Sequence, residues 1–205
     1  MKKVTLFKYG LTALMMAFAM TLCFSCSSDD DEENNQEVNP PSNAEGQING
    51  HAYVELAGIK WATENVDEVN GVTALGYNLW FYYYSQYNAK KAAASWGGTW
   101  TLPTEAQWQK LIDECYWEWT KKMGMDKKYN GNSGYIVSDK KDSSKFIFLP
   151  ATGYCDDIDT KLRDQGDYGY YWSSGYYSYL SFYNGLWRMR YYDDNLGMAV
   201  RPVSN

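Results

Sequence analysis

The stretch Gly169–Val203, which reads GYYWSSGYYSYLSFYNGLWRMRYYDDNLGMAVRPV, decides how the end of this chain folds. Within it, Asn184-Gly185 lies between two runs of alternating residues, and both residues tolerate the positive φ of a type I′ turn. The sequence therefore predicts a β-hairpin with a two-residue loop. Its register pairs Tyr183 with Leu186, Phe182 with Trp187, Ser181 with Arg188, Leu180 with Met189 and Tyr179 with Arg190.

The two faces of this hairpin differ in chemistry, because successive side chains of a strand point to opposite sides. One face is apolar, and we expect it to be core: it carries Leu180, Phe182, Trp187 and Met189. The other face is amphipathic and suits a wet binding surface as well as a covered sheet. Its members are the candidate ligand-binding residues of the chain: Tyr177, Tyr179, Tyr183, Arg188 and Arg190.

Two helices are expected before this hairpin. Asn88 is the predicted cap of the first, with residues 89–96 as its body and Gly97-Gly98 as its end. Thr104 caps the second and forms a capping box with Gln107. The spacing of its apolar residues predicts one buried face, which carries Trp108, Leu111, Ile112 and Cys115.

Short strands are predicted on both sides of the helices, at residues 53–56, 59–62, 135–138 and 145–149. Residues 155–167 show no periodicity, and we expect a long loop there. Strands at both ends with helices between them predict an α+β domain in which the N- and C-terminal strands lie together. Its core is expected to contain Trp61, Trp108, Trp172 and Trp187.

Residues 1–25 have the pattern of a targeting segment, with three lysines before an apolar run that is shorter than the about 20 residues of a membrane span. Leu22–Cys26 resembles a bacterial lipobox, which implies cleavage before Cys26 and lipidation of its thiol. The serines and acids that follow resemble the export signal that carries lipoproteins of Bacteroidota to the outer face of the outer membrane. The alternative is an ordinary secreted protein with an acidic tail.

Residues 26–50 are expected to form a disordered acidic tether, because they contain seven acids and no base. Residues 51–205, the predicted folded domain, carry 16 bases and 18 acids. A domain so close to neutrality gives no electrostatic reason to expect nucleic acid as a partner. The expected partners are therefore the lipid of the outer membrane, through Cys26, and an unidentified extracellular glycan or protein.

Few residues offer the chemistry of a metal or catalytic site. His51 is the only histidine, and we expect it at the surface because it borders the tether. Cys115 and Cys155 are the only cysteines of the domain, and the sequence does not decide whether they pair. Without a CxxC pair or a second histidine, no metal or other cofactor is expected.

Five segments resemble, in order, the Fibrobacter succinogenes major paralogous domain, a family of bacterial surface and secreted domains. They are GIKWATENV at 58–66, WGGTWTLPTEAQW at 96–108, FLPATGY at 148–154, YWSS at 171–174 and AVRPV at 199–203. The second segment is also similar to formylglycine-generating sulfatase-modifying enzymes. The resemblance covers nearly all of residues 50–205 and implies a C-type-lectin-like fold outside the cell, usually with no known chemistry.

The expected fold is thus α+β: a C-type-lectin-like domain with two helices, short antiparallel strands and a C-terminal β-meander. Sulfatase-modifying enzymes use reactive cysteines near the end of their domain, and Leu196–Val203 contains none, so we expect that activity to be absent. With no nucleophile and base pair in the sequence, we do not expect an enzyme. Calcium lectins of this fold use a Trp-Asn-Asp motif among others. Weak calcium candidates lie near its position, although they also suit a hairpin loop: Asp193, Asp194 and Asn195.

The leading interpretation is a cell-surface lipoprotein whose domain binds a glycan or a protein without catalysis. One alternative is a hydrolase of the sulfatase-modifying superfamily that uses the loop carboxylates Asp156, Asp157 and Asp159. Another is a structural accessory subunit of fimbriae or of the cell surface. A fold that serves many functions does not choose among them.

Overall fold

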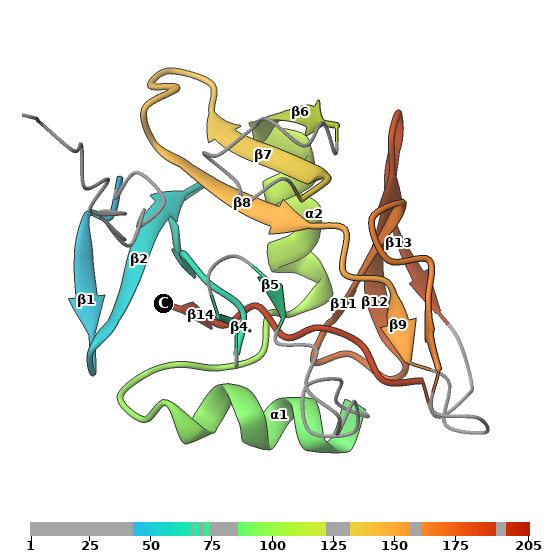
Figure 1. The fold of residues 1–205 in the computed structure, drawn as a ribbon. Coiled ribbons are helices and arrows are strands. Elements are labelled where there is room, and N and C mark those ends of the chain that lie inside the picture. The colour runs from blue at the N-terminus through green and yellow to red at the C-terminus, as the bar shows by residue number, and fades with distance from the viewer. Residues whose placement is uncertain are drawn as a thin grey trace, which may run out of the picture. The chain divides into compact units, whose positions relative to one another are not determined.

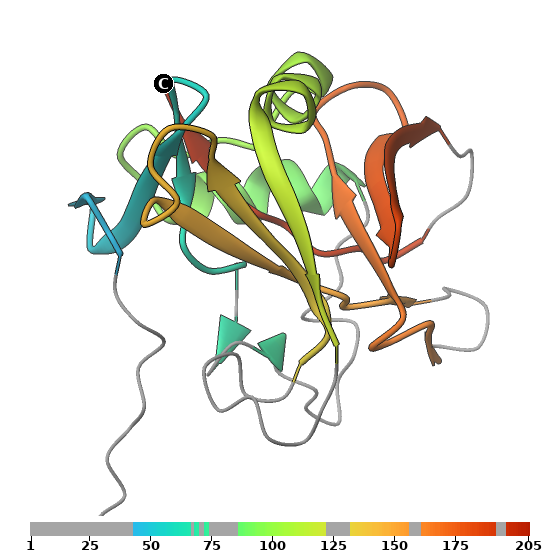
Figure 2. The same ribbon diagram turned by 90° about the horizontal axis from the view of Figure 1, so that it is seen from above.

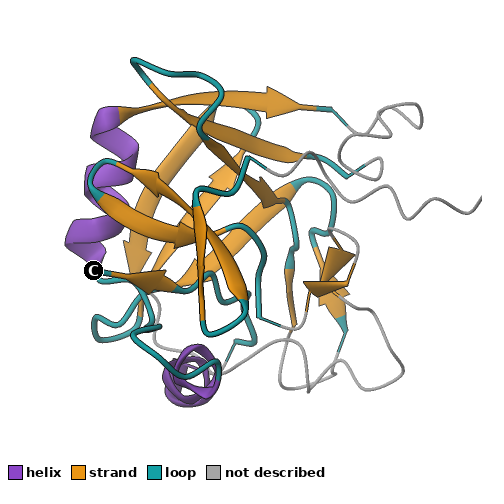
Figure 3. Cartoon of the chain, turned by 90° about the vertical axis from the view of Figure 1, so that its left-hand side faces the viewer, coloured by secondary structure: helices purple, strands orange, loops and turns teal. Residues whose placement is uncertain are grey.

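The computed structural model describes residues 43–66, 68–69, 72–73, 86–121, 132–155, 161–191 and 196–205. These residues form an α+β structure of two helices and several small antiparallel sheets, with more strand than helix (Figure 1, Figure 3). The α+β class predicted from the sequence is confirmed at this level.

The first sheet joins the two ends of the folded part. It contains β1 (Gly46–Ile48), β2 (His51–Leu56), β3 (Ile59–Ala62) and β14 (Val203–Ser204), in that order and antiparallel throughout. Val203 of the last strand pairs with Trp61 of the third. The prediction that the N- and C-terminal strands lie together is therefore confirmed.

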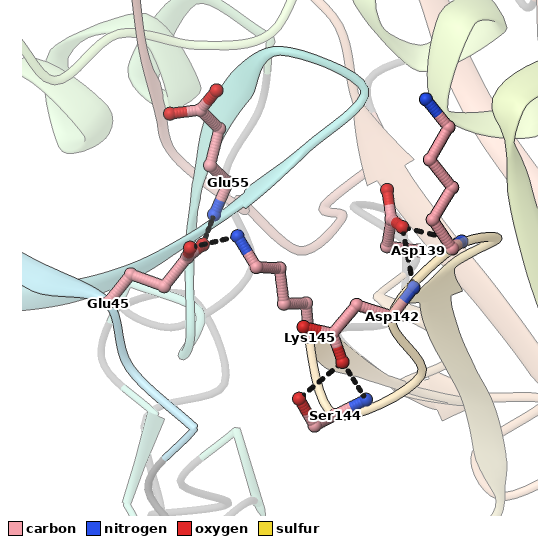
Figure 4. A network of polar contacts seen from close by, with 7 residues as sticks. Glu45, Glu55, Asp139, Asp142, Ser144 and Lys145 are labelled. Carbon is pink, nitrogen blue, oxygen red and sulfur yellow. Dashed lines mark hydrogen bonds and ion pairs between the residues drawn. The ribbon is translucent and has the colours of Figure 1, made fainter.

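The folded part begins earlier than residue 51. Asn49 and Gly50 form the turn between β1 and β2, with φ values of 50° and 86°. The side chain of Glu45 accepts hydrogen bonds from Lys145 Nζ and, at 2.6 Å, from the backbone N–H of Glu55 (Figure 4). The expected tether of residues 26–50 is thus too long at its C-terminal end, because a second Asn-Gly hairpin takes residues 43–50 into the sheet.

Both predicted helices are present. Helix α1 (Gln86–Ser95) already includes the two residues before the expected cap at Asn88. The side chain of Gln86 donates to the carbonyl of Ser173 and accepts from the backbone N–H of Tyr177. The helix ends as predicted, at Gly97 and Gly98, which have φ values of 71° and 60°. Helix α2 (Glu105–Glu114) has the predicted capping box between Thr104 and Gln107.

A second sheet follows α2 directly. It consists of β6 (Cys115–Thr120), β7 (Gly134–Asp139) and β8 (Phe146–Pro150), in that order. Strands β7 and β8 correspond to the strands predicted at residues 135–138 and 145–149. Strand β6 was not predicted, because it follows α2 without an intervening turn and the apolar period changes at Cys115.

The third sheet is the C-terminal meander of β11 (Tyr168–Trp172), β12 (Ser178–Tyr183) and β13 (Leu186–Tyr191). Strands β12 and β13 pair in the predicted register, including Tyr183 with Leu186 and Tyr179 with Arg190. Two short pairs complete the structure: β4 (Glu68–Val69) with β5 (Val72–Thr73), and β9 (Tyr154–Cys155) with β10 (Leu162–Arg163). The expected loop at 155–167 therefore contains a strand.

The main core lies between α2 and the three large sheets. Trp61 and Trp108 are fully buried there, with ring centroids 4.7 Å apart. Trp187 is only half-buried, but it stacks on Trp117 at 5.6 Å with an interplanar angle of 4°. A second core lies beneath α1 and contains Trp172. Three of the four tryptophans expected in the core are therefore fully buried, and the fourth lies at its rim.

One buried cation connects the strands that surround this core. Arg201 has no exposed surface, and among the described residues its guanidinium donates to Asn65 Oδ1 at 2.7 Å, to the carbonyl of Ala62 at 3.0 Å and to the carbonyl of Phe148 at 2.8 Å. Asn65 in turn donates to the hydroxyl of Tyr171 at 3.4 Å, and this hydroxyl donates to the carbonyl of Pro150 at 2.7 Å. The network joins the ends of β3 and β8, strand β11 and the C-terminal segment.

This geometry predicts a large difference between a buried and an exposed arginine. Arg201→Lys should lower the free energy of unfolding by about 3 kcal/mol, because one ammonium group cannot replace a planar donor that reaches three acceptors. Arg188→Lys, the same change at an exposed position of β13, should change it by less than about 0.5 kcal/mol. Urea unfolding of both variants measures the difference, and equal effects would contradict the central role of Arg201.

Candidate ligand-binding face

The C-terminal sheet has two faces of different chemistry. Its inner face packs into the main core through Tyr171, Leu180 and Phe182. The opposite face, called the outer face here, alternates with it along all three strands. Its members are Tyr168, Tyr170, Trp172, Tyr179, Ser181, Tyr183, Leu186, Arg188 and Arg190. The sheet lies on the opposite side of the folded part from β1 (Figure 2).

One half of the outer face is covered. Tyr179 is only 5% exposed and Ser181 only 6%. Tyr179 belongs to the second core and packs edge-on against Trp172, with ring centroids 6.0 Å apart. The prediction that Tyr179 binds a ligand is therefore wrong. Tyr179 is a core residue, because α1 and the segment around Met198 pack into the same cluster.

Tyr177 lies outside the sheet. It precedes β12 and has a φ of 48°, which few non-glycine residues adopt. Its backbone N–H donates to Gln86 Oε1 at 3.1 Å, and its ring lies 4.3 Å from that of Tyr176. Tyr177 thus belongs to a turn held by α1, and the structure does not join it to the other candidate residues.

The other half of the outer face is open, and we call it the open half: Tyr168, Tyr183, Arg188 and Arg190. Tyr183 is 38% exposed, and both arginines are exposed. Tyr168 pairs with Tyr183 across the strands, and their ring centroids are 5.1 Å apart. Three of the five candidate residues are therefore exposed on this face. In the register Arg188 lies opposite Ser181 and Arg190 lies opposite Tyr179.

Tyr168 was missed in the sequence. The sequence could have predicted it, because residues two apart on a strand share a face, so Tyr168 lies on the same outer face as Tyr170. The pairing of β11 with β12 then brings Tyr168 beside Tyr183.

Tyr170 connects the open half to the covered half. Its ring lies between those of Tyr168 and Tyr179, at 6.1 and 6.2 Å. Burial, together with the hydrogen bond that its hydroxyl donates to Asp164 Oδ2 at 3.0 Å, raises the pKa of Tyr170 well above its usual range. The hydroxyl therefore stays protonated, and the contact holds the ring in the row of tyrosines.

A second surface feature is a charged groove lined by the β2–β3 turn, α2 and the β7–β8 turn. Five acids and four lysines line it: Glu55, Asp113, Glu114, Asp139 and Asp142, with Lys110, Lys140, Lys141 and Lys145. The carboxylate of Asp139 accepts from the backbone N–H groups of Lys141 and Asp142 (Figure 4), and these bonds lower its pKa. Several of the groove's polar groups already have partners: Lys140 Nζ donates to the carbonyl of Asp113, and Lys145 Nζ donates to Glu45. Because the acids and lysines of the groove nearly balance, it favours neither an anionic nor a cationic ligand.

The remaining reactive side chains of the described residues suggest no catalytic or metal site. Cys115 and Cys155 are both buried, and no disulfide bond joins them. Burial raises the pKa of the Cys115 thiol to about 11, which keeps it protonated and unreactive near neutral pH. His51 is half-buried rather than fully exposed, since its ring stacks on Trp96 at 3.7 Å. Among the described residues, no three Cys, His, Asp or Glu side chains form a group able to hold a metal.

Several sequence predictions lie outside the described residues. These are the lipidation site Cys26, the weak calcium candidates Asp193, Asp194 and Asn195, and the loop carboxylates Asp156, Asp157 and Asp159. In the described part of the chain, neither helix is long and apolar enough to cross a membrane.

No model of a known protein family matches this chain, nor does any curated protein or any solved structure.

The division of the outer face predicts opposite effects for two tyrosines on the same strand. Tyr179→Ser should lower the free energy of unfolding by about 3 kcal/mol or more, because it empties a buried aromatic site. Tyr183→Ser should change it by less than about 1 kcal/mol, since that ring is exposed. Thermal and urea unfolding report both values. Similar costs at the two positions would show that the face is not divided in this way.

Proposed function

We propose that this chain is a surface-anchored lipoprotein whose folded domain binds an extracellular ligand without catalysis. The observation that carries the proposal is the open half of the outer face. There Tyr168 and Tyr183 share one face with Arg188 and Arg190, on a sheet whose other face is packed into the core. Tyrosine and arginine dominate the binding energy of many interfaces, and a rigid support lowers the entropy lost on binding.

A C-type-lectin-like fold of the major paralogous type is part of this proposal. It is supported by the places that the five resembling segments take in the structure. Trp61, Trp108, Leu149 and Tyr171 are fully buried in the main core, and Arg201 connects their strands. Such segments maintain a fold, so within a family they would recur whatever the ligand.

The binding surface can be tested with two exposed tyrosines on different sheets. Glycan-array and pull-down screens of the mature protein should identify a ligand, and Tyr183→Ser should then weaken its binding by about thirtyfold, as loss of a hot spot does. Tyr116→Ser, at a position of β6 that is 59% exposed, is the matched control and should bind normally. If both variants bind like the wild type, the ligand site is elsewhere.

The anchor is tested separately. The lipobox-like segment before Cys26 implies that the cysteine thiol carries the lipid, so Cys26→Ala should leave the precursor uncleaved or move the protein out of the membrane fraction. Mass spectrometry of the mature N-terminus and cell fractionation measure this. An unmodified N-terminus together with unchanged fractionation would remove the anchor from the proposal.

A further inference from the structure

The open half lies in the most basic part of the described chain. Residues 161–191 contain four bases and two acids, whereas the whole chain has a formal net charge of −6. One of these acids, Asp164, accepts the hydroxyl hydrogen of Tyr170. Arg188 and Arg190 are exposed, and neither has a hydrogen-bond or ion-pair partner within the residues that the structure describes. Two exposed guanidinium groups thus lie on one face of the sheet.

Their spacing suits a chain of anionic groups. Arg188 and Arg190 are two residues apart on β13, so their Cα atoms are about 7 Å apart along the strand. Guanidinium groups bind sulfate, phosphate and carboxylate through paired N–H donors. A ligand with one acidic group would use one arginine, whereas a polymer with repeated acidic groups would use both.

The tyrosines add a second requirement. Tyr183 and Tyr168 are adjacent rings on a sheet, one 38% exposed and the other half-buried. Rings held in this way offer apolar surface and a polar tip to a ligand with both kinds of group, as a sugar ring has. A purely ionic partner would gain nothing from them.

We propose that the ligand of the open half is an acidic polysaccharide, whose sulfate or carboxylate groups bind Arg188 and Arg190 while its sugar rings pack against Tyr183 and Tyr168. This inference rests on the proposed function and names the class of ligand for the same surface. It differs from a calcium-dependent lectin site, because cationic side chains of the protein supply the charge.

The test uses one polymer in two charge states. The mature protein should bind dextran sulfate at least tenfold more tightly than neutral dextran, and raising the salt from low to high concentration should weaken that binding. The double change Arg188→Gln with Arg190→Gln should lower the affinity for dextran sulfate by a factor of at least about ten. Lys90→Gln with Lys91→Gln, which removes the same charge from exposed positions of α1, should cost less than about threefold.

Three results would overturn the inference. Equal binding of the two dextrans would show that charge does not select the ligand, and equal losses in the two double variants would show that binding follows net charge and not this surface. Tighter binding of poly-glutamate than of dextran sulfate or polygalacturonate, lost in the arginine variant, would identify an acidic protein as the partner.

The proposed function fails or survives separately. A neutral glycan that binds the wild type and is lost in Tyr183→Ser would keep the open half as a binding surface and reject the acidic ligand. If no polymer of either charge binds, and screening finds no ligand that depends on Tyr183, both proposals fall. Far-UV and near-UV circular dichroism of each variant shows that a loss of binding is not a loss of folding.

Discussion

The folded part of this chain depends on one buried cation. Arg201 donates to the carbonyls of Ala62 and Phe148, which belong to two different sheets, and to Asn65, which reaches Tyr171 of the third. Moving a charge out of water is costly, so such a group is tolerated only where several acceptors surround it. The small sheets bury limited surface by themselves, and the hydrogen bonds of Arg201 fix how their ends meet.

This arrangement separates the residues that hold the fold from those available for function. The five segments singled out in the sequence supply Trp61, Trp108, Tyr171 and Arg201, all without appreciable exposure. These four residues pack or bond the strands together, and their side chains are not accessible to a ligand. Arg188 and Tyr183 lie outside these segments. Resemblance in the core therefore carries information about architecture, whereas the choice of ligand depends on residues that can change without disturbing the core.

Local signals in the sequence were sufficient for the elements that local chemistry determines. Asn184-Gly185 and the alternation around it predicted the register of β12 with β13, and Thr104 with Gln107 predicted the start of α2. The burial of Tyr179 could not be predicted in this way, because it results from packing beside α1, far away in the sequence. Alternation shows which face a side chain is on, but not what covers that face. The candidate site was accordingly predicted in part: the arginines and Tyr183 are exposed, and Tyr179 and Tyr177 have structural roles.

The division of the outer face also explains how a small sheet can be both stable and accessible. Strand β12 is central and is buried on both faces, through Phe182 on one side and Tyr179 on the other. Strand β13 lies at the edge of the sheet, so it can leave Arg188 and Arg190 in solvent. Trp187, which precedes Arg188 on the same strand, points to the inner side and stacks on Trp117. The inward side chains of β13 hold the strand in place. A ligand can therefore bind its outward arginines without a change in the backbone. The acidic polymer proposed above would therefore bind a sheet that is already folded, which lowers the entropy lost on binding.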